Sequence, residues 1–432
     1  MCSCPFALSR QTKKWRASFH LSPKTNPKED PNMSLTPSLT NTDFIQPANR
    51  IANFQPYFFA SLNKVIAQLK ADGMDVVRID MGSPDLPPAD FIIERLVSEV
   101  RKPTTHGYSP IGGPASYREA IATYYKRRFN VDLDPKKEVL GLIGSKEGLF
   151  NLSQVLLNPG DVTLVPDPGY PVYSAGGLIA GGEVVYVPLL RKNGFLPDLD
   201  AIPAEVAAKA KILWLNYPNN PTGAVASLEF FQKAVEFGRQ YHVVIAHDAP
   251  YADICFNGYI APSILQVPGA KEVAVEFNSL AKAYNMAGWR LGMAVGNAKV
   301  VGYLDTYKSQ MDTSHFGPVF SAGVEALTGD QNWLEERNLI YLERRDICLK
   351  ALREVGFDVD TPPAAIYVWA HLPKPYTDDL AFCDQLLREA GVSMTPGVVY
   401  GENGKGYIRI SLGTETKRIA EAMQRLVKWM KK

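Results

Sequence analysis

The chain has few cysteines, and the ones it has do not form a recognisable set. Only five of its 432 residues are cysteines, and the number is odd. A sparse set of this kind suits a reducing compartment and argues against a disulfide framework. Cys2 and Cys4 have no second Cys/His pair to complete a metal site, so no metal is expected. The cysteines are Cys2, Cys4, Cys255, Cys348 and Cys383.

Long apolar runs and an excess of charge are also missing. No apolar stretch approaches the roughly 18 residues that a transmembrane helix needs, so no membrane span is expected. Lys plus Arg total 46 against 45 for Asp plus Glu, which leaves a net charge of +1. This balance offers no broad basic field for nucleic acid. We therefore expect a cytoplasmic protein whose partners are small molecules.

The first 42 or so residues differ in composition from the rest. They are rich in Pro, Ser, Thr, Asn and Lys and show no sustained period, which predicts a disordered tail. They also lack the apolar centre of a secretory signal. Two explanations stay open: an over-long N-terminus with Met33 as the start, and an organelle-targeting segment in the basic, acid-free stretch 1–28. We favour the first.

From about residue 138, short apolar runs alternate with longer helical patterns. This alternation is typical of βαβ units, and it predicts an α/β fold with a mostly parallel central sheet flanked by helices. The length of the chain allows a second, smaller α+β domain beside it. The runs cover residues 139–143, 162–166, 211–215, 243–247, 273–277 and 293–296.

A polar motif follows each of the first five runs. In chain order these motifs read GSKEG, DPGYPVY, NYPNNPTG, DAPYAD and NSLAK. Taken singly, each could be an ordinary turn rich in Gly, Pro and Asn. In an open parallel sheet, however, the loops at the carboxyl ends of the strands gather in one crevice that holds the ligand. Five such motifs in succession predict one shared polar site.

From about residue 50 to the C-terminus, these motifs resemble the fold type I, class I/II aminotransferases that use pyridoxal 5′-phosphate. Lys282, in SLAKAYNMAGWR, resembles the lysine that bonds to the cofactor aldehyde and later moves a proton. Asp248 resembles the aspartate that keeps the ring nitrogen protonated, and Tyr251 the tyrosine that hydrogen-bonds the phenolic oxygen. The resemblance implies that these three residues are catalytic.

The same resemblance implies the residues that hold the cofactor. Asn220 resembles the asparagine that contacts the phenolic oxygen and the substrate carboxylate, and Tyr170 the aromatic that stacks on the ring. Ser145 and Lys146 open a predicted helix whose N-terminus could face the phosphate. A packed core tyrosine for Tyr170 and a surface lysine for Lys146 remain open alternatives. The implied phosphate ligands are Ser145, Lys146, Ser279, Arg290 and Tyr108.

Two further residues resemble residues that bind the substrate, and Tyr108 implies a second subunit. Arg409, in GYIRISLGT, resembles the arginine that binds the α-carboxylate through two parallel hydrogen bonds. Gly82, in IDMGSPDLPP, resembles the glycine whose backbone N–H approaches that carboxylate. Tyr108 resembles a tyrosine that reaches the phosphate of the partner subunit. The resemblance therefore implies a homodimer with shared active sites.

The order of the motifs predicts how the chain divides. Residues 1–48 are expected to be the tail, and 49–91 an N-terminal arm with the first part of the small domain. Residues 92–319 would form the large cofactor-binding domain and 320–432 the C-terminal small domain, which closes over the site. The apolar spacing of 415–432 predicts a helix packed on the core.

Several stretches, among them GSKEGLFNL and NGFLPDLDAIP, resemble the LL-diaminopimelate aminotransferase branch. The implied reaction moves an amino group from LL-diaminopimelate to 2-oxoglutarate in lysine biosynthesis. Segment 307–319 departs from the pattern of that branch at His315 and Phe316, and no second arginine can be assigned to a distal carboxylate. An alanine/aspartate-type aminotransferase and a pyridoxal-phosphate-dependent β-lyase therefore stay open as alternatives.

Overall fold

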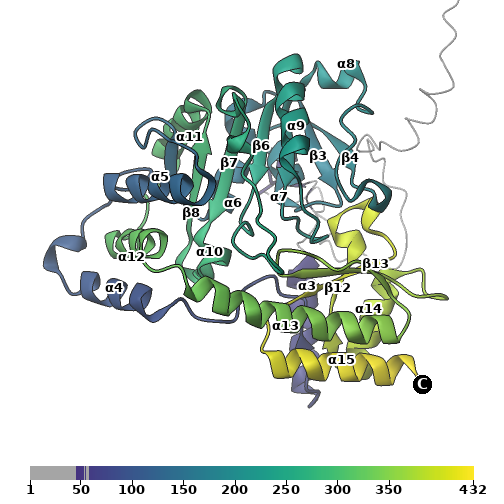
Figure 1. Ribbon diagram of the computed structural model, residues 1–432. Helices are drawn as coiled ribbons and strands as arrows, with labels where there is room; N and C mark the ends of the chain where they lie inside the picture. Colours follow the sequence, from purple (N-terminus) through teal and green to yellow (C-terminus); the bar gives the residue numbers. More distant parts are fainter. Residues whose placement is uncertain (1–44, 53, 55–57) are drawn as a thin grey trace, which may run out of the picture.

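The computed structural model describes residues 45–52, 54 and 58–432 (Figure 1). Most of the expected tail, with Cys2, Cys4 and Met33, lies outside the described residues. The first described helix is α2 (Asn49–Ala52), and it is followed by α3 (Phe58–Ala71). Within the described part, no helix is both long and apolar enough to cross a membrane.

A seven-stranded sheet forms the centre of the molecule, in the order β2-β8-β7-β6-β5-β3-β4. β3 to β7 run parallel to their neighbours in this group, whereas β8 is antiparallel to both β2 and β7. The predicted α/β fold with a mostly parallel sheet is confirmed. The strands are β2 (Val139–Ile143), β3 (Val162–Asp167), β4 (Glu183–Pro188), β5 (Ala210–Asn216), β6 (Val244–Asp248), β7 (Ala274–Ser279) and β8 (Leu291–Gly296).

Strand β4 was absent from the six predicted runs. It lies at the edge of the sheet, where its first residue, Glu183, is exposed and Tyr186 is only partly buried. The other edge strand, β2, was predicted, and β4 carries the apolar stretch 184–187, so its omission has no structural reason. The six other strands lie within two residues of the predicted runs.

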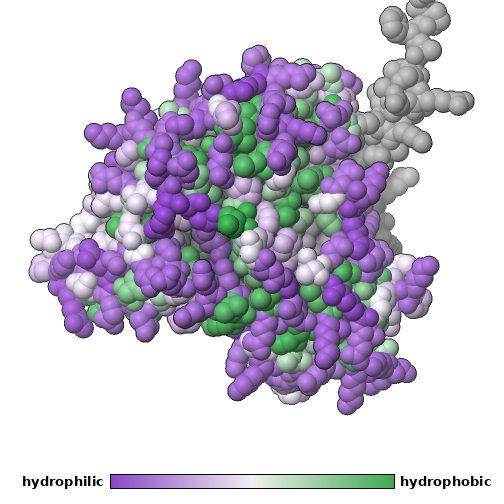
Figure 2. All heavy atoms as spheres, in the orientation of Figure 1, coloured by the Kyte–Doolittle hydropathy of each residue, from purple (hydrophilic) through white to green (hydrophobic). Residues whose placement is uncertain are grey.

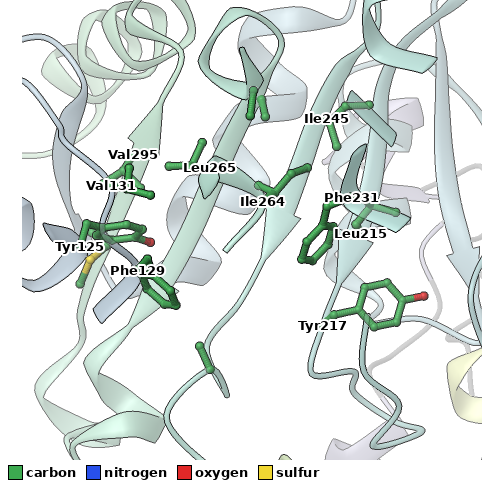
Figure 3. Close-up of a cluster of buried hydrophobic side chains, with 14 of the residues drawn as sticks. Tyr125, Phe129, Val131, Leu215, Tyr217, Phe231, Ile245, Ile264, Leu265 and Val295 are labelled. Atoms are coloured by element: carbon green, nitrogen blue, oxygen red, sulfur yellow. The ribbon is translucent and has the colours of Figure 1, made fainter. Parts of the chain in front are cut away.

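Helices cover both faces of this sheet. One core lies between the sheet and helices α5, α9 and α12, and a second lies between the sheet and α6, α7 and α11. Neighbouring strand residues point to opposite cores, as Ile245 and Ala246 of β6 do. Figure 3 shows part of the first core, where Tyr125 and Phe129 of α5 and Phe231 of α9 lie over the strands. Because both faces are buried, the strands are continuous apolar runs.

The helices of this layer have the following bounds. They are α4 (Asp90–Val100), α5 (Ala115–Phe129), α6 (Ser145–Leu156), α7 (Val172–Ile179), α8 (Ala204–Ala207), α9 (Leu228–Tyr241), α10 (Leu280–Ala283), α11 (Ala298–Met311) and α12 (Gly317–Thr328). Short 3₁₀ helices occupy Pro103–Thr105, Arg191–Asn193, Ile264–Gln266, Ala270–Glu272, Ala287–Trp289, Gly397–Tyr400 and Glu402–Gly404.

Two small sheets lie below the carboxyl ends of the central strands in Figure 1, together with the C-terminal helices. One is antiparallel, in the order β12-β13-β10-β9, and the other pairs β1 with β11 in parallel. Their strands are β1 (Val77–Arg78), β9 (Asp358–Val359), β10 (Tyr367–His371), β11 (Val392–Ser393), β12 (Thr395–Pro396) and β13 (Tyr407–Ser411). The helices are α13 (Trp333–Glu354), α14 (Asp379–Ala390) and α15 (Thr416–Met430).

A third core joins these small sheets to α13, α14 and α15. It draws on residues near Val77, on Tyr341 and on residues up to Leu426, so it joins the segment around β1 to the C-terminal part of the chain. Helix α12 packs instead on the first core, through residues such as Leu327. The division at 91/92 and 319/320 stays a prediction.

Figure 2 shows that hydrophilic side chains predominate on the outer surface of this face, with apolar groups between them.

Candidate active site

A cavity of about 560 Å³ lies where the central strands end and the small sheets begin. Strands β5, β6 and β7 contribute Asn216, Asp248 and Ser279, and β10 and β13 contribute Tyr367 and Arg409. Eleven of the twelve predicted site residues line this cavity, although the sequence separates them by as many as 327 positions. These residues are Gly82, Ser145, Lys146, Tyr170, Asn220, Asp248, Tyr251, Ser279, Lys282, Arg290 and Arg409.

Lys282 lies on α10, the short helix that directly follows β7. The hydroxyl of Ser279 caps this helix by accepting from the backbone N–H of Ala281 at 3.2 Å. The Lys282 amine donates to the carbonyl oxygen of Gly82. Burial, followed by the charges of Arg409 and Arg290, lowers the pKa of Lys282 to about 8. The site therefore brings this amine close to its neutral, nucleophilic form at mildly alkaline pH.

Asp248 ends β6 and is buried. Its Oδ2 accepts from the Tyr173 hydroxyl at 2.7 Å, and the side chain of Asn216 donates to its backbone oxygen at 2.7 Å. Burial raises the pKa of Asp248 to about 7, against the opposing effects of Tyr173, His247 and Lys282. Oδ1 has no hydrogen-bond partner among the described residues. A buried carboxylate oxygen without a donor fits a ligand that brings one, such as a protonated ring nitrogen.

Arg409 lies between two aromatic rings at the opposite side of the cavity. Its guanidinium carbon is 4.4 Å from the ring centre of Tyr367 and 4.9 Å from that of Tyr400. Nη1 donates to Asn220 Oδ1 at 3.0 Å, and Nη2 donates to the backbone oxygen of Asp80 at 2.7 Å. Within the described chain, Nε has no partner and no carboxylate forms an ion pair with Arg409. A buried guanidinium in this state suits a carboxylate ligand.

Tyr251 is held by a second tyrosine. Its hydroxyl and that of Tyr367 are 2.7 Å apart, and the two rings meet edge to face. A Cβ atom on Gly82 would lie 2.5 Å from the Tyr367 hydroxyl, so a larger residue at this position would disturb the tyrosine pair. Burial and the neighbouring Tyr367 raise the pKa of Tyr251 well above its usual range. The Tyr251 hydroxyl is therefore neutral in this site.

Positive charge and hydrogen-bond donors gather at the N-terminus of α6. Ser145 is the first residue of this helix, and Lys146 and Arg290 lie beside it. A Cβ atom on Gly144 would lie 2.3 Å from Arg290 Nη2, so only glycine lets the guanidinium approach this backbone. Lys146 Nζ is 5.8 Å from the ring centre of Tyr170. A helix N-terminus with two cations fits a phosphate group.

Segment 307–319 contacts residues near the N-terminus of α6, at the end of the cavity that fits a phosphate group. The ring of His315 donates from Nε2 to the backbone oxygen of Arg290. The buried amine of Lys308 bonds both to Glu147, in the first turn of α6, at 3.1 Å and to Asp312 at 2.8 Å. The departure from the branch pattern at His315 therefore lies beside a predicted phosphate ligand. This segment does not line the cavity of its own chain.

Tyr108 is the one predicted site residue that the structure does not bring to the cavity. Its side chain is 92% exposed. The role expected of it concerns the site of a partner subunit, which a single chain does not test. That role stays a prediction.

Four residues of the site were not singled out from the sequence. Tyr173 and Asn216 lie within the motifs DPGYPVY and NYPNNPTG, so their position after a strand was a usable signal. Tyr367 and Tyr400 lie in YVWAHLP and GVVYG, where nothing local distinguishes them from packed aromatics. Their contact with Arg409 depends on how the small sheet folds over the large one.

Comparisons with known proteins agree with this geometry. The family model "Aminotransferase class I and II" matches residues 74–426. The LL-diaminopimelate aminotransferase of Moorella thermoacetica is 49% identical over 382 residues, which are 88% of this chain and 98% of that protein. The structure of substrate-bound BacF from Bacillus subtilis is 37% identical, with a TM-score of 0.85 over 89% of this chain and 98% of that one. A single mutant of Thermus thermophilus aspartate aminotransferase is 29% identical, with a TM-score of 0.83 over 89% and 99%.

The fold and the site define a transaminase. The chain belongs to the class I and II aminotransferase family. Pyridoxal 5′-phosphate is the cofactor that this family implies, and the residues present fit it. The unpartnered Asp248 Oδ1, the lowered pKa of Lys282 and the cationic N-terminus of α6 would suit its ring nitrogen, its aldehyde and its phosphate. The individual roles of the site residues are proposals.

The lowered pKa of Lys282 can be measured in the protein without cofactor. Only the neutral amine reacts with acetic anhydride, so labelling of Lys282 should rise with pH to a midpoint near 8. The Arg409→Met variant should move this midpoint upward, because it removes a neighbouring positive charge. Peptide mass spectrometry gives the extent of labelling, with the exposed Lys428 as internal reference. A midpoint near the ordinary 10.5 would contradict the description of this lysine.

The fit of Arg409 to a carboxylate predicts a cost for the smaller cation. In Arg409→Lys the charge stays, but the planar fork is lost, together with the bond to Asn220 or to Asp80. We expect a loss of about 2–3 kcal/mol of transition-state stabilisation, or about 30- to 150-fold in kcat/KM. Steady-state kinetics provide the measurement, with Arg388→Lys on the exposed face of α14 as the matched control. Unchanged kcat and KM would remove Arg409 from the substrate site.

Proposed function

We propose that this chain transfers the amino group of LL-diaminopimelate to 2-oxoglutarate, as an enzyme of lysine biosynthesis. The observation that carries the transaminase chemistry is the arrangement of Lys282, Asp248 and Arg409 around one cavity. The choice of substrate is supported by 49% identity across 98% of the Moorella thermoacetica LL-diaminopimelate aminotransferase. Other LL-diaminopimelate aminotransferases, among them that of Aquifex aeolicus at 45% identity, support the same choice.

The substrate enters as an α-amino acid whose carboxylate binds Arg409. The guanidinium already lies between Tyr367 and Tyr400 and bonds to Asn220, so it loses little freedom when the carboxylate arrives. This contact orients the substrate's Cα toward Lys282, which lines the same cavity. Because Arg409 is buried, water does not compete for the carboxylate.

Lys282 then moves the proton at Cα. Its amine needs to be neutral in order to accept that proton, and burial beside Arg409 and Arg290 favours the neutral form. When bound, pyridoxal 5′-phosphate supplies the electron sink that stabilises the negative charge left at Cα. Asp248, whose Oδ1 has no partner among the described residues, would keep the proton on the ring nitrogen, while Tyr173 fixes the carboxylate through Oδ2.

A second subunit belongs to the proposal. We propose a homodimer in which Tyr108 of each chain reaches the phosphate of the other chain's cofactor. Tyr108 is 92% exposed, and Ile111, Met311 and Phe316 are also exposed apolar residues. Phe316 packs on His106, with 5.4 Å between the ring centres, so the two exposed segments adjoin. Such a patch is typical of a surface that another protein covers.

We also propose that the enzyme works in the cytoplasm. Within the described chain, Cys255, Cys348 and Cys383 are free thiols. Burial raises the pKa of the Cys348 thiol to about 12, which keeps it protonated and unreactive. Free, buried thiols of this kind suit a reducing compartment.

An amino-donor screen tests the substrate. With 2-oxoglutarate as acceptor, glutamate should form from LL-diaminopimelate with a kcat/KM at least about tenfold above those for alanine and aspartate. The reason is that contacts to the distal end of a substrate, which the two smaller amino acids lack, are worth about 1–3 kcal/mol. Glutamate is measured by a coupled dehydrogenase assay, and Lys282→Ala is the inactive control. Equal or better use of alanine or aspartate would contradict the proposed donor. Release of pyruvate and ammonia without an acceptor would instead identify a β-lyase.

A mixed-dimer experiment tests the shared site. Tyr108→Ala and Lys282→Ala chains are each expected to be impaired, and they are denatured and refolded together. If Tyr108 serves the partner's site, each mixed dimer contains one intact site, so random pairing restores about a quarter of the wild-type activity. If Tyr108 serves its own chain, no intact site forms and activity stays at the level of the variants. Sedimentation gives the proportion of dimer.

A further inference from the structure

His247 is a buried titratable residue that the mechanism above does not use. It precedes Asp248 on β6 and points to the opposite side of the sheet, where its ring packs on Phe231 with 4.7 Å between the ring centres. Nδ1 lies 2.8 Å from Glu276 Oε2 on the neighbouring strand β7, and Nε2 lies 3.1 Å from the backbone oxygen of Tyr217. Both ring nitrogens therefore face oxygen atoms.

The hydrogen-bond partner of Nε2 shows that this nitrogen carries a proton. A backbone carbonyl oxygen has lone pairs and no hydrogen, so Nε2 must donate to the oxygen of Tyr217. The remaining question is whether the second proton of the His247 and Glu276 pair lies on the imidazole or on the carboxyl group. A proton on Nδ1 would make His247 a cation, and a proton on Glu276 would leave both groups neutral.

The other partners of Glu276 decide this question. Oε2, the oxygen that faces His247, also accepts from the Ser263 hydroxyl at 2.8 Å and from the backbone N–H of Ile264 at 3.1 Å. The Tyr125 hydroxyl of α5 lies 2.8 Å from Oε1. In either case one hydrogen lies between Nδ1 and Oε2, and the donors at Ser263, Ile264 and Tyr125 favour a carboxylate as its acceptor. A carboxylate surrounded by donors is stabilised in its ionised form.

We propose that His247 donates from both ring nitrogens, to Glu276 and to the Tyr217 carbonyl, and that its positive charge makes it a positioning residue that keeps the neighbouring Asp248 ionised. The proposal rests on the proposed cofactor site, because an ionised Asp248 is what a protonated ring nitrogen requires. Without a nearby cation, burial would favour the protonated carboxyl group, which could not hold that nitrogen as a charged partner.

The groups around Asp248 agree with this role. Tyr173 of α7 donates to its carboxylate, Asn216 of β5 donates to its backbone oxygen, and Lys282 of α10 adds positive charge. Lys282, however, is expected to lose its charge when it works as a base. His247 is the cation beside Asp248 whose two N–H groups are both committed to oxygen atoms, so its charge does not depend on the state of the reaction.

Nitrogen NMR of the imidazole rings tests the protonation state directly, in the full chain without cofactor. The chain has six histidines, so selective ¹⁵N labelling gives few signals, and the signal lost in His247→Gln is assigned to His247. We expect both nitrogens of His247 to carry hydrogen, with the exposed His242 as internal reference. Glu276→Gln should remove one of these hydrogens. A single protonated nitrogen in the wild-type protein would overturn the proposal, whatever the variants do.

The effect on Asp248 is measured with His247→Gln, which keeps a donor but removes the charge. The acid limb of the kcat/KM profile should move to higher pH by about one unit, and the dissociation constant for pyridoxal 5′-phosphate should rise about tenfold. Phe231→Leu is the matched control: it removes the ring contact but leaves the charge, so the acid limb should stay in place. An equal shift in both variants would show a merely structural role. The shift of the acid limb and the change in cofactor affinity do not depend on which amino acid is the donor. These two measurements can therefore fail while the amino-donor screen succeeds, and the reverse.

Discussion

The burial of incompletely paired charge at the carboxyl edge of the central sheet is the constraint on which this structure depends. Lys282, Asp248 and Arg409 are withdrawn from water around a single cavity, and none of them has a full set of partners within the described chain. Charges interact more strongly in such an environment than in water, so Arg409 lowers the pKa of Lys282, and Lys282 in turn opposes the rise in the pKa of Asp248. The lowered pKa of the lysine and the raised pKa of the aspartate are both consequences of this burial.

The fold keeps these charges buried by enclosing them between two layers. The central sheet supplies one wall through the ends of β5, β6 and β7, and the antiparallel sheet supplies the other through Tyr367 and Arg409. The segment around Gly82 closes the gap, since the backbone oxygen of Gly82 accepts from Lys282 and that of Asp80 accepts from Arg409. Stability and chemistry therefore compete here, because the bonds that hold Lys282 and Arg409 are ones that ligands would replace.

Behind this cavity, a second buried network supports the same strands. His247, Glu276 and Tyr125 link β6, β7 and α5 on the far side of the sheet, and their hydrogen bonds are satisfied within the chain. The contrast with Asp248 Oδ1 is informative, because that atom is one residue away and has no partner among the described residues. Satisfied polar groups rigidify a site, whereas an unpaired carboxylate oxygen that lines a cavity can accept a hydrogen bond from a ligand.

The sequence by itself determined the order of strands and polar motifs. Central strands buried on both faces are continuous apolar runs, and the chemistry follows each run directly, so Asp248, Ser279 and Lys282 could be recognised locally. Tertiary structure alone decided the enclosure of Arg409 by Tyr367 and Tyr400, and the pairing of Asp248 with Tyr173. Local periodicity reports which side of an element is buried, whereas the identity of its neighbours depends on contacts between residues far apart in the chain.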